Sequence, residues 1–338
     1  MPASRPAVSA AFPDPDHLLL PAPRPRRLRG PQTDFDVMIV GAGSAGLSAA
    51  LVLGRSCRRV LVADGGPPRN APSPAVHAFL TRDGTPPAEL LKLGREQLRP
   101  YDTVEVRPVR VTAIVRQRGG FAVKAVAASD EGPAVPVTAR RVLLCTGVLD
   151  ELPPLAGARE LWGRGVLHCP YCHGWEVRGE PLAVYGRGKI GYGLSLLVSR
   201  WSEDVVLLAD GPSNIARSGL ARMRSQGVRL CEDPIERLVG TPKGDLRHVL
   251  FRSGQKLPRT ALFLHVEQRQ RSDLASQLAC RLTQAGAVWT DKNGQTSQPG
   301  VYAAGDIDPG PQQAIIAAAE ASWAAIKLNE GLTKEECR

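Results

Sequence analysis

The chain has 338 residues, enough for two domains of ordinary size, and 43% of them are hydrophobic, so it can bury sizeable cores. Its formal net charge is +10, but the Lys and Arg residues are scattered and aromatic residues make up only 5%. That distribution lacks the basic stripe interleaved with aromatic residues that is typical of nucleic-acid binding, so no nucleic-acid partner is expected. No apolar run approaches the roughly 18 residues of a membrane helix, so no membrane partner is expected either.

Residues 1–33 are rich in Pro and Arg and lack the apolar stretch of a signal peptide. We therefore interpret this segment as a disordered tail and expect ordered structure to begin at Asp34. The seven cysteines are an odd number, and only Cys169 and Cys172 are closely spaced. This usage does not fit a secreted disulfide framework, and it favours a reducing compartment, the cytoplasm.

The first ordered unit, residues 34–64, has the pattern of a strand, a glycine turn, a helix and a second strand. The short run VMIV is followed at once by GAGSAG, then by the small and helix-forming residues LSAALVLGRS, and then by RVLVAD. In such a unit Gly41 permits a tight turn, Gly43 lets backbone approach a pyrophosphate, and Gly46 allows close packing of helix on strand. Asp64 stands about 20 residues on, where an acid binds the adenosine ribose. The unit predicts dinucleotide binding.

Three further segments follow in chain order. Residues 65–87 form a long loop dense in Pro and Gly, on which His77 either faces a bound cofactor or is an ordinary loop residue. The sequence AELLKLGREQLRPY, residues 88–101, predicts a helix. Residues 103–146 hold short β-type runs and predict a small sheet that ends in a buried strand.

The stretch HCPYCHGW, residues 168–175, places Cys169 and Cys172 two residues apart, with His173 directly after the second. A structural zinc site needs further soft ligands, which the distant single cysteines do not supply, and His168 and His173 lie too close in sequence for a usual tetrahedral site. Two inert cysteines are the other alternative. The pair lies between two nucleotide-type units, and this favours a redox disulfide. No metal is expected.

A second strand–glycine turn–helix–strand unit spans residues 181–211, so the chain contains an internal repeat. Its loop GRGKIG carries Gly186, Gly188 and Gly191, and its second strand ends at Asp210. A carboxylate there repels the 2′-phosphate of NADPH and suits a free ribose hydroxyl. Further short strands, the motif GVYAAGD and an alanine-rich helix over residues 312–330 complete the chain.

Two more motifs carry a family resemblance. GVYAAGD, residues 300–306, and LLCTGVLDELPPLAG, residues 143–157, resemble markers of flavoproteins with two dinucleotide-binding domains. From residue 34 to about residue 330 the chain resembles the low-molecular-weight thioredoxin reductases, with the flavin unit, the Thr-Gly crossover, WGRGV, the cysteine pair, the second unit and GVYAAGD in the same order. CPYCHG is also similar to the branch of dithiol oxidases, which close disulfides in small natural products and pass electrons from flavin to oxygen.

The resemblance implies an α/β fold of two Rossmann-like, three-layer domains and a homodimer. The FAD domain, residues 34–155 and 258–330, would be split by an inserted central domain, residues 156–257, which contains the cysteine pair and resembles a nucleotide-binding domain. Residues 331–338 would form a tail.

The resemblance also implies FAD as cofactor and the residues that bind it. These are Gly41, Gly43, Ser44, Ala45, Gly46, Asp64, Gly65, Arg69, Asn70, Thr146, Gly147, Gly305, Asp306, Gln313 and Ala314. Cys172 would lie against the flavin, and Cys169 would exchange with an external dithiol or disulfide. The reductases carry an acid where this chain has His173, whose ordinary pKa suits it to deprotonate a thiol, unless it is a packing residue.

Together these patterns predict an FAD-dependent thiol–disulfide oxidoreductase that works on a small-molecule or protein dithiol, without NADPH. The central unit, with Gly186, Gly188, Gly191 and Asp210, would be empty, or would hold NADH or a second FAD. An NAD(P)H-dependent disulfide reductase and a diflavin enzyme remain the alternatives, and a flavin-bound redox sensor is the alternative outside catalysis.

Overall fold

The computed structural model describes residues 33–128 and 135–338, so the expected tail at residues 1–33 lies outside the described residues except for Thr33. The first sheet has the strand order β3-β2-β1-β6-β5-β4, and β17 pairs with the last part of β6. Its strands are β1 (Phe35–Val40), β2 (Val60–Ala63), β3 (Val104–Arg107), β4 (Val109–Gln117), β5 (Gly120–Ala127), β6 (Val135–Leu144) and β17 (Val301–Ala303).

The parallel part of this sheet, β3-β2-β1-β6 with β17, joins segments that lie far apart in the sequence. β1 and β2 are buried almost throughout, as expected for apolar, β-branched runs covered on both faces. Because these strands are parallel, the carboxyl ends of β1, β2, β6 and β17 meet at one edge. The glycine loop, Asp64, Thr146 and Asp306 follow those four ends directly.

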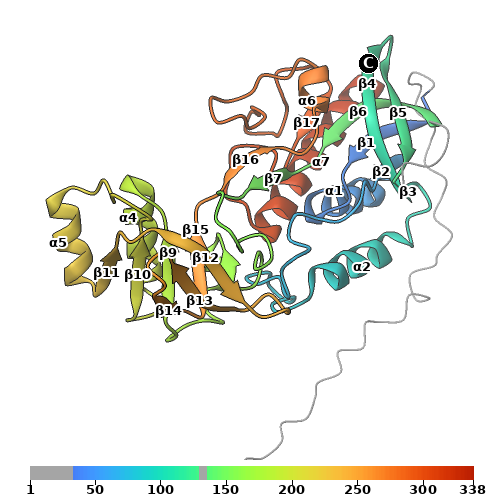
Figure 1. Cartoon of the computed structure of the whole chain (residues 1–338). Helices are drawn as coiled ribbons and strands as arrows, with labels where there is room; N and C mark the ends of the chain where they lie inside the picture. The colour runs from blue at the N-terminus through green and yellow to red at the C-terminus, as the bar shows by residue number, and fades with distance from the viewer. Residues whose placement is uncertain (1–32, 129–134) are drawn as a thin grey trace, which may run out of the picture. The chain divides into compact units, whose positions relative to one another are not determined.

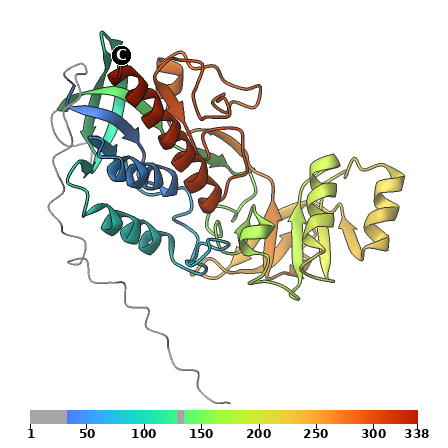
Figure 2. The ribbon, with the colours of Figure 1, turned by 180° about the vertical axis from the view of Figure 1, so that it is seen from behind.

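Three helices accompany the sheet: α1 (Ser44–Arg55), α2 (Pro87–Leu98) and α7 (Ala314–Glu336). α1 contacts both α2 and α7, and Figures 1 and 2 show α1 and α7 side by side against the sheet. The buried face of α7 is built mainly from alanines, which let it approach α1 closely; these are Ala317, Ala318, Ala321, Ala324 and Ala325.

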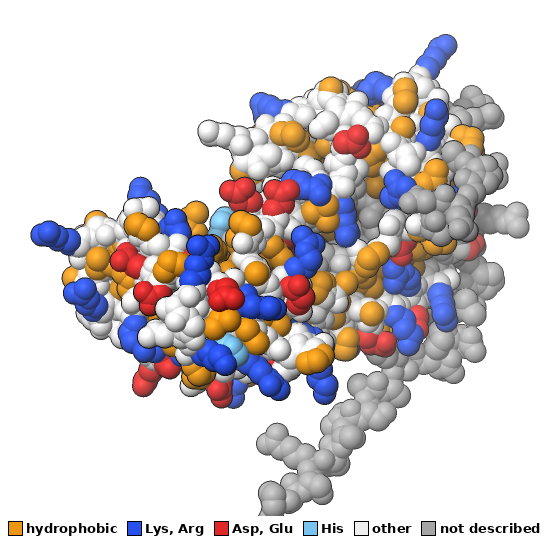
Figure 3. Space-filling model, viewed as in Figure 1, with side chains coloured by type: hydrophobic (Ala, Val, Ile, Leu, Met, Phe, Trp, Pro, Cys, Tyr) orange, Lys and Arg blue, Asp and Glu red, His pale blue; other side chains and the backbone are white. Residues whose placement is uncertain are grey.

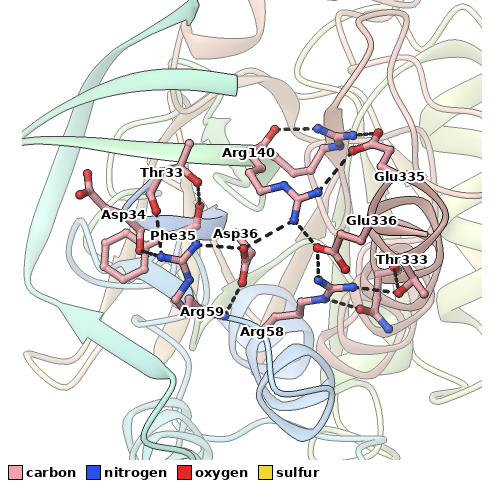
Figure 4. Close-up of polar contacts among 12 residues, drawn as sticks. Thr33, Asp34, Phe35, Asp36, Arg58, Arg59, Arg140, Thr333, Glu335 and Glu336 are labelled. Carbon is pink, nitrogen blue, oxygen red and sulfur yellow. Dashed lines mark hydrogen bonds and ion pairs between the residues drawn. The ribbon is translucent and has the colours of Figure 1, made fainter. Parts of the chain in front are cut away.

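The expected tail at residues 331–338 is wrong, because α7 continues to Glu336. The Glu336 side chain is only 4% exposed and accepts hydrogen bonds from Arg58 (2.6 Å) and Arg140. Arg140 is 5% exposed, and Glu335 pairs with Arg140 (3.5 Å) and with Arg141. Figure 4 shows how Arg140 joins Glu335 and Glu336 at the end of α7 to Asp36 in β1.

The second sheet has the order β11-β10-β9-β15-β8, and all its pairs are parallel. Its strands are β8 (Val166–Leu167), β9 (Leu182–Tyr185), β10 (Val205–Leu208), β11 (Val228–Cys231) and β15 (Ala261–Leu264). β15 pairs with β9 and β8, so the central unit extends to Leu264. The expected boundary at residue 257 is therefore too early, because the buried run ALFL belongs to this sheet and not to the FAD domain.

Helices α4 (Gly188–Val198) and α5 (Arg217–Ser225) complete the second nucleotide-type unit, and β12 (Ile235–Gly240), β13 (Leu246–Phe251) and β14 (Lys256–Pro258) form a separate antiparallel sheet. The chain crosses between the two large sheets twice, through β7 (Val148–Glu151) and β16 (Glu267–Gln270), which pair with each other. Two one-turn helices are α3 (Pro170–His173) and α6 (Leu274–Gln277). Two parallel sheets with flanking helices confirm the expected fold class.

On the face drawn in Figure 3, Lys and Arg side chains are interspersed with Asp, Glu and hydrophobic side chains. Within residues 33–128 and 135–338, no helix combines the length and apolar character needed to cross a bilayer.

Candidate active site

A large cavity of about 1040 Å³ opens at the edge where the strands of the first sheet end. Most of the residues expected to bind FAD line it: Gly41, Gly43, Ser44, Ala45, Gly65, Arg69, Asn70, Thr146, Gly147, Asp306, Gln313 and Ala314. Cys172 and His173 line the same cavity, although they come from the segment after β8. Segments from both large sheets thus meet around one space.

The glycine loop has the geometry that a pyrophosphate cradle needs. Gly41 has φ +112°, and a Cβ there would lie 2.2 Å from the carbonyl oxygen of Cys145. A Cβ at Gly46 would lie 1.8 Å from the carbonyl oxygen of Gly41, so this glycine is required for the turn to close on α1. A Cβ at Gly43 would meet no protein atom within 4 Å, because Gly43 faces the cavity. Gly41 and Gly46 thus allow the tight turn against α1, and the position at Gly43 is open to the cavity.

Three of the expected cofactor residues do not line the cavity. Gly46 packs inside the turn, and Gly305 adopts φ +83° and donates its N–H to Glu320 Oε2 at 3.2 Å. Asp64 lies at the end of β2, where its Oδ2 accepts a hydrogen bond from Arg95 at 2.5 Å. The Arg95 pairing leaves Asp64 Oδ1 to accept only a long bond from Gly66 N at 3.3 Å.

Arg69, on the loop after β2, connects that loop to the paired strands β7 and β16, along which the chain crosses between the two large sheets. Its guanidinium donates to both carboxylate oxygens of Asp150, at 2.6 and 2.8 Å, and to Asp306 Oδ2 at 2.9 Å. Gln312 Oε1 accepts a further bond from Arg69 at 2.7 Å and another from Gln268 at 2.6 Å. These partners raise the pKa of Arg69 even though burial opposes the shift. The network fixes Asp306 at the cavity wall.

The residues at this edge fit a flavin dinucleotide. Thr146 lines the cavity, and its buried Oγ1 has no hydrogen-bond partner within the described protein. A buried hydroxyl without a partner costs free energy unless a ligand satisfies it. Together with the open position at Gly43, this orphaned hydroxyl indicates that a polar ligand completes the site.

Cys169 and Cys172 form a disulfide, with Cα atoms 5.3 Å apart. Pro170 begins α3 directly after Cys169, and the turn brings Cys172 N–H to the carbonyl oxygen of Cys169 at 3.2 Å. Cys172 lines the cavity and Cys169 does not. In the described residues, no group of three or more His, Cys, Asp or Glu side chains could hold a metal ion. The remaining thiol at the cavity, Cys145, is buried, and this burial raises its pKa strongly.

His173 lies inside the protein beside this disulfide. Its Nε2 is 2.9 Å from the hydroxyl of Ser73, and its Nδ1 is buried without a hydrogen-bond partner. Burial lowers the pKa of His173, and the neighbouring His77 ring, 6.4 Å away and perpendicular to it, lowers that pKa further. His173 is therefore neutral over a wider pH range than an exposed histidine.

Several residues of the site carry no sequence signal. His168 stacks on Trp162 with ring centroids 5.5 Å apart, and burial together with the charge of Arg69 lowers its pKa to about 4. Ser73, Asp150, Gln268 and Gln312 also line the cavity. Their partners are distant in sequence, so no spacing motif could have found them, whereas the loop position of His77 gave a weak hint.

The second glycine loop differs from the first because one of its own side chains, Arg187, binds the neighbouring backbone. The Arg187 guanidinium folds back onto the end of β10, where it donates to the carbonyl oxygens of Ala209 (2.6 Å) and Asp210. Asp210 has φ +51°, and its Oδ1 accepts a hydrogen bond from Ile235 N at 2.7 Å. Gly191 packs against Gly186, as expected for a Rossmann turn. Asp210, like Asp64 in the first unit, thus has a protein hydrogen-bond partner, and the two loops differ in the position of Arg187.

Comparison with known proteins supports the same reading. Residues 35–321 match the model of the pyridine nucleotide-disulphide oxidoreductase family. A putative thioredoxin reductase from Bacillus anthracis is 31% identical, with a TM-score of 0.82 over 89% of this chain and 99% of that one. The crystal structure of HlmI is 35% identical, with a TM-score of 0.82 over 91% of this chain and 96% of that one. Thioredoxin reductase sirT of Leptosphaeria maculans is 29% identical over 80% of this chain and 86% of that protein.

The family match covers most of the chain, and the glycine cradle and the Cys169–Cys172 disulfide are the parts that such an enzyme needs. The chain belongs to the pyridine nucleotide-disulphide oxidoreductase family and is a thioredoxin reductase-like, FAD-dependent disulfide oxidoreductase.

Proposed function

We propose that the enzyme is a dithiol oxidase, which takes electrons from a dithiol through Cys169–Cys172 and delivers them to oxygen or another acceptor without NADPH. The observation that carries this proposal is the chemistry at the end of β10. Asp210 would repel a 2′-phosphate, its Oδ1 is bonded to Ile235 N, and Arg187 covers the neighbouring backbone carbonyls. Arg187 is thus engaged by its own chain and is not directed toward an external phosphate.

The disulfide supplies the electron-transfer chemistry on the protein side. A substrate thiolate attacks Cys169 Sγ, the Cys169–Cys172 bond breaks, and Cys172 leaves as a thiolate at the cavity wall. The second substrate thiol then attacks the substrate sulfur held on Cys169, which closes the substrate disulfide and releases Cys169. In the bound state FAD supplies the acceptor for the electron pair that the two cysteines have gained.

The names of the relatives bear on the substrate. The Bacillus anthracis and Leptosphaeria maculans proteins are named thioredoxin reductases, so a protein disulfide handled in the opposite direction is the alternative. The motif CPYCHG favours a small-molecule dithiol instead. We further propose the homodimer and the cytoplasmic location that the family resemblance implies, and we assign FAD binding to the twelve expected residues that line the cavity, with Gly46, Asp64 and Gly305 shaping its loops.

The test is anaerobic bleaching of the flavin absorbance in the purified yellow protein, with NADPH, NADH and dithiothreitol added separately. Bleaching by the dithiol alone, followed by return of the colour over many cycles in air, is expected. Fast bleaching by NADPH would establish a reductase and overturn the reading of Asp210. In Cys172→Ser, bleaching by the dithiol should be lost, whereas Cys231→Ser, which changes a free thiol of the second sheet, should behave like the wild type.

A further inference from the structure

Ser73 makes a hydrogen-bond pattern that constrains where the proton of His173 can be. Ser73 Oγ donates to the carbonyl oxygen of Ala75 at 2.7 Å and lies 2.9 Å from His173 Nε2. A serine hydroxyl has one proton, and a carbonyl oxygen can only accept. We infer that the Ser73 proton lies toward Ala75 at this 2.7 Å contact, since two oxygen lone pairs would otherwise face each other. Ser73 Oγ therefore accepts from His173, and Nε2 carries the proton.

The other ring nitrogen is then the basic one. Neutral imidazole has one N–H and one lone pair, so the lone pair lies on Nδ1. In the neutral ring Nδ1 is buried and has no hydrogen-bond partner, whereas a backbone hydrogen bond with Cys169 favours the protonated ring. A buried lone pair without a partner is costly in a resting protein, which points to a function in the reaction.

We propose that Ser73 is a positioning residue, which holds the proton of His173 on Nε2 so that Nδ1 accepts the thiol proton during disulfide exchange. This inference rests on the proposed function. When the second substrate thiol attacks the substrate sulfur bound to Cys169, its proton passes to Nδ1. The new substrate S–S bond forms, the bond from Cys169 Sγ to the substrate breaks, and Cys169 leaves as a thiolate. The proton on Nδ1 then passes to that thiolate, which restores the neutral ring.

Ser73 lies on the long Pro-rich loop, which the chain holds in place near the disulfide. Its backbone N–H donates to the carbonyl oxygen of Asn70 at 3.0 Å, so the turn that carries Ser73 is itself fixed. A Cβ on Gly163 would lie 2.8 Å from Pro72 Cβ, so the segment before β8 packs tightly against this loop. The loop thus supplies a rigid acceptor for a histidine 100 positions away in sequence.

The direct test is the tautomer of His173, measured by nitrogen-15 NMR on the FAD-loaded protein with labelled histidine, and assigned by the signal lost in His173→Asn. In the wild type, at a pH where the ring is neutral, Nε2 should be protonated and Nδ1 should have the shift of an unprotonated ring nitrogen. In Ser73→Ala, which cannot accept from Nε2, the proton should move to Nδ1, where the Cys169 backbone stabilises it. A wild-type ring protonated on Nδ1, or an unchanged tautomer in Ser73→Ala, would overturn the proposal.

The second readout is the rate of anaerobic reduction by a dithiol in a single mixing experiment. General-base catalysis contributes about 10²–10⁴-fold, and a wrong tautomer forfeits part of it, so Ser73→Ala should reduce the rate about tenfold or more. Ser202→Ala is the matched control: its hydroxyl also donates to a carbonyl, that of Glu180 (2.6 Å), and accepts from an N–H, that of Asp204 (3.1 Å), yet it has no histidine partner. This variant should leave tautomer and rate unchanged.

The two readouts separate this inference from the proposed function. If no dithiol reduces the wild-type protein, the proposed function fails while the NMR result still decides the tautomer. If Ser73→Ala shifts the tautomer but the rate is unchanged, Ser73 orients the ring without serving catalysis, and the proposal is overturned.

Discussion

At the scale of single residues, the sequence predicts the roles of some groups in the site and not of others. Gly41, Gly43 and Gly46 form a motif of fixed spacing, so the sequence alone predicts a tight glycine loop, although the closest contact of Gly41 is with the distant carbonyl oxygen of Cys145. The partner of His173 is Ser73, 100 positions earlier, and no local pattern encodes such a contact. The sequence therefore identified His173 as a candidate base, but it did not identify Ser73, which we propose fixes the position of the proton on the His173 ring.

Adding a single methyl group at Gly43 tests whether the glycine loop binds the cofactor. A Cβ at Gly43 would touch no protein atom within 4 Å, so Gly43→Ala should leave the stability of the apoprotein nearly unchanged. The same methyl group would enter the space where backbone approaches the pyrophosphate, so FAD affinity should fall about tenfold or more, which corresponds to about 1.4 kcal/mol. Isothermal titration of apoprotein with FAD and urea denaturation measure the two quantities.

Gly46→Ala is the contrasting variant for that experiment. Its Cβ would lie 1.8 Å from the carbonyl oxygen of Gly41, so the turn itself must open and the apoprotein should be destabilised. Equal loss of stability in both variants, or full FAD affinity in Gly43→Ala, would contradict the assigned geometry.

At the scale of elements, the strands and helices near the glycine loops were predictable because each is a local, strongly apolar pattern. The predicted helix over residues 312–330 is present, but it extends six residues further, to Glu336. The sequence GLTKEE has a single large apolar residue, Leu332, which is fully buried and continues the apolar face of α7. The end of the helix is also held by Arg58 and Arg140, which lie on other elements and meet Glu336 only in the folded chain. The late end of the central sheet at Leu264 has a similar cause, because pairing with β9 and β8 assigns β15 to that sheet.

The end of α7 therefore carries a stability prediction. The Glu336 side chain is 4% exposed and bonded to Arg58 and Arg140, whose side chains are 12% and 5% exposed, so Glu336→Ala would remove the buried carboxylate that these two guanidinium groups share. Removing one partner of a buried ion pair typically costs about 3–5 kcal/mol. Glu335, which is 47% exposed, is the matched control, and Glu335→Ala should cost less than about 1 kcal/mol. Urea denaturation at pH 7 compares the two.

The same carboxylate gives this effect a pH dependence. The hydrogen bonds from Arg58 and Arg140 lower the pKa of Glu336 below its unfolded value, although burial opposes them. Its contribution to stability is therefore present above the unfolded pKa and is lost as the pH falls through the folded pKa. The difference between wild type and Glu336→Ala should shrink below about pH 4. A difference that is equal at pH 7 and pH 3 would argue against an ionised Glu336.

At the scale of the whole molecule, the chain uses one supersecondary unit twice with different outcomes. Both units have a parallel strand pair, a glycine loop and an acid at the end of the second strand. The middle glycine of each loop, Gly43 or Gly188, has no protein atom within 4 Å of an added Cβ, but only the first unit adds an unpartnered hydroxyl, that of Thr146, at a large cavity within the described residues. In the second, Arg187 and Ile235 engage the carbonyls and carboxylate at the end of β10. The repeat was visible in the sequence, but this difference depends on side-chain orientation, which the sequence left open.

This contrast predicts the amount of flavin that the protein holds. We expect one FAD per chain, because a second adenosine would have to displace Arg187 from the carbonyl oxygens of Ala209 and Asp210. Flavin released by denaturation, measured by absorbance against protein quantified by amino-acid analysis, gives the ratio. Arg187→Ala removes the guanidinium from the second glycine loop, and its FAD content is compared with that of the wild type. Two FAD per chain in the wild type would make the protein a diflavin enzyme, whereas a ratio that rises above one only in Arg187→Ala would identify this guanidinium as the group that keeps the second unit empty.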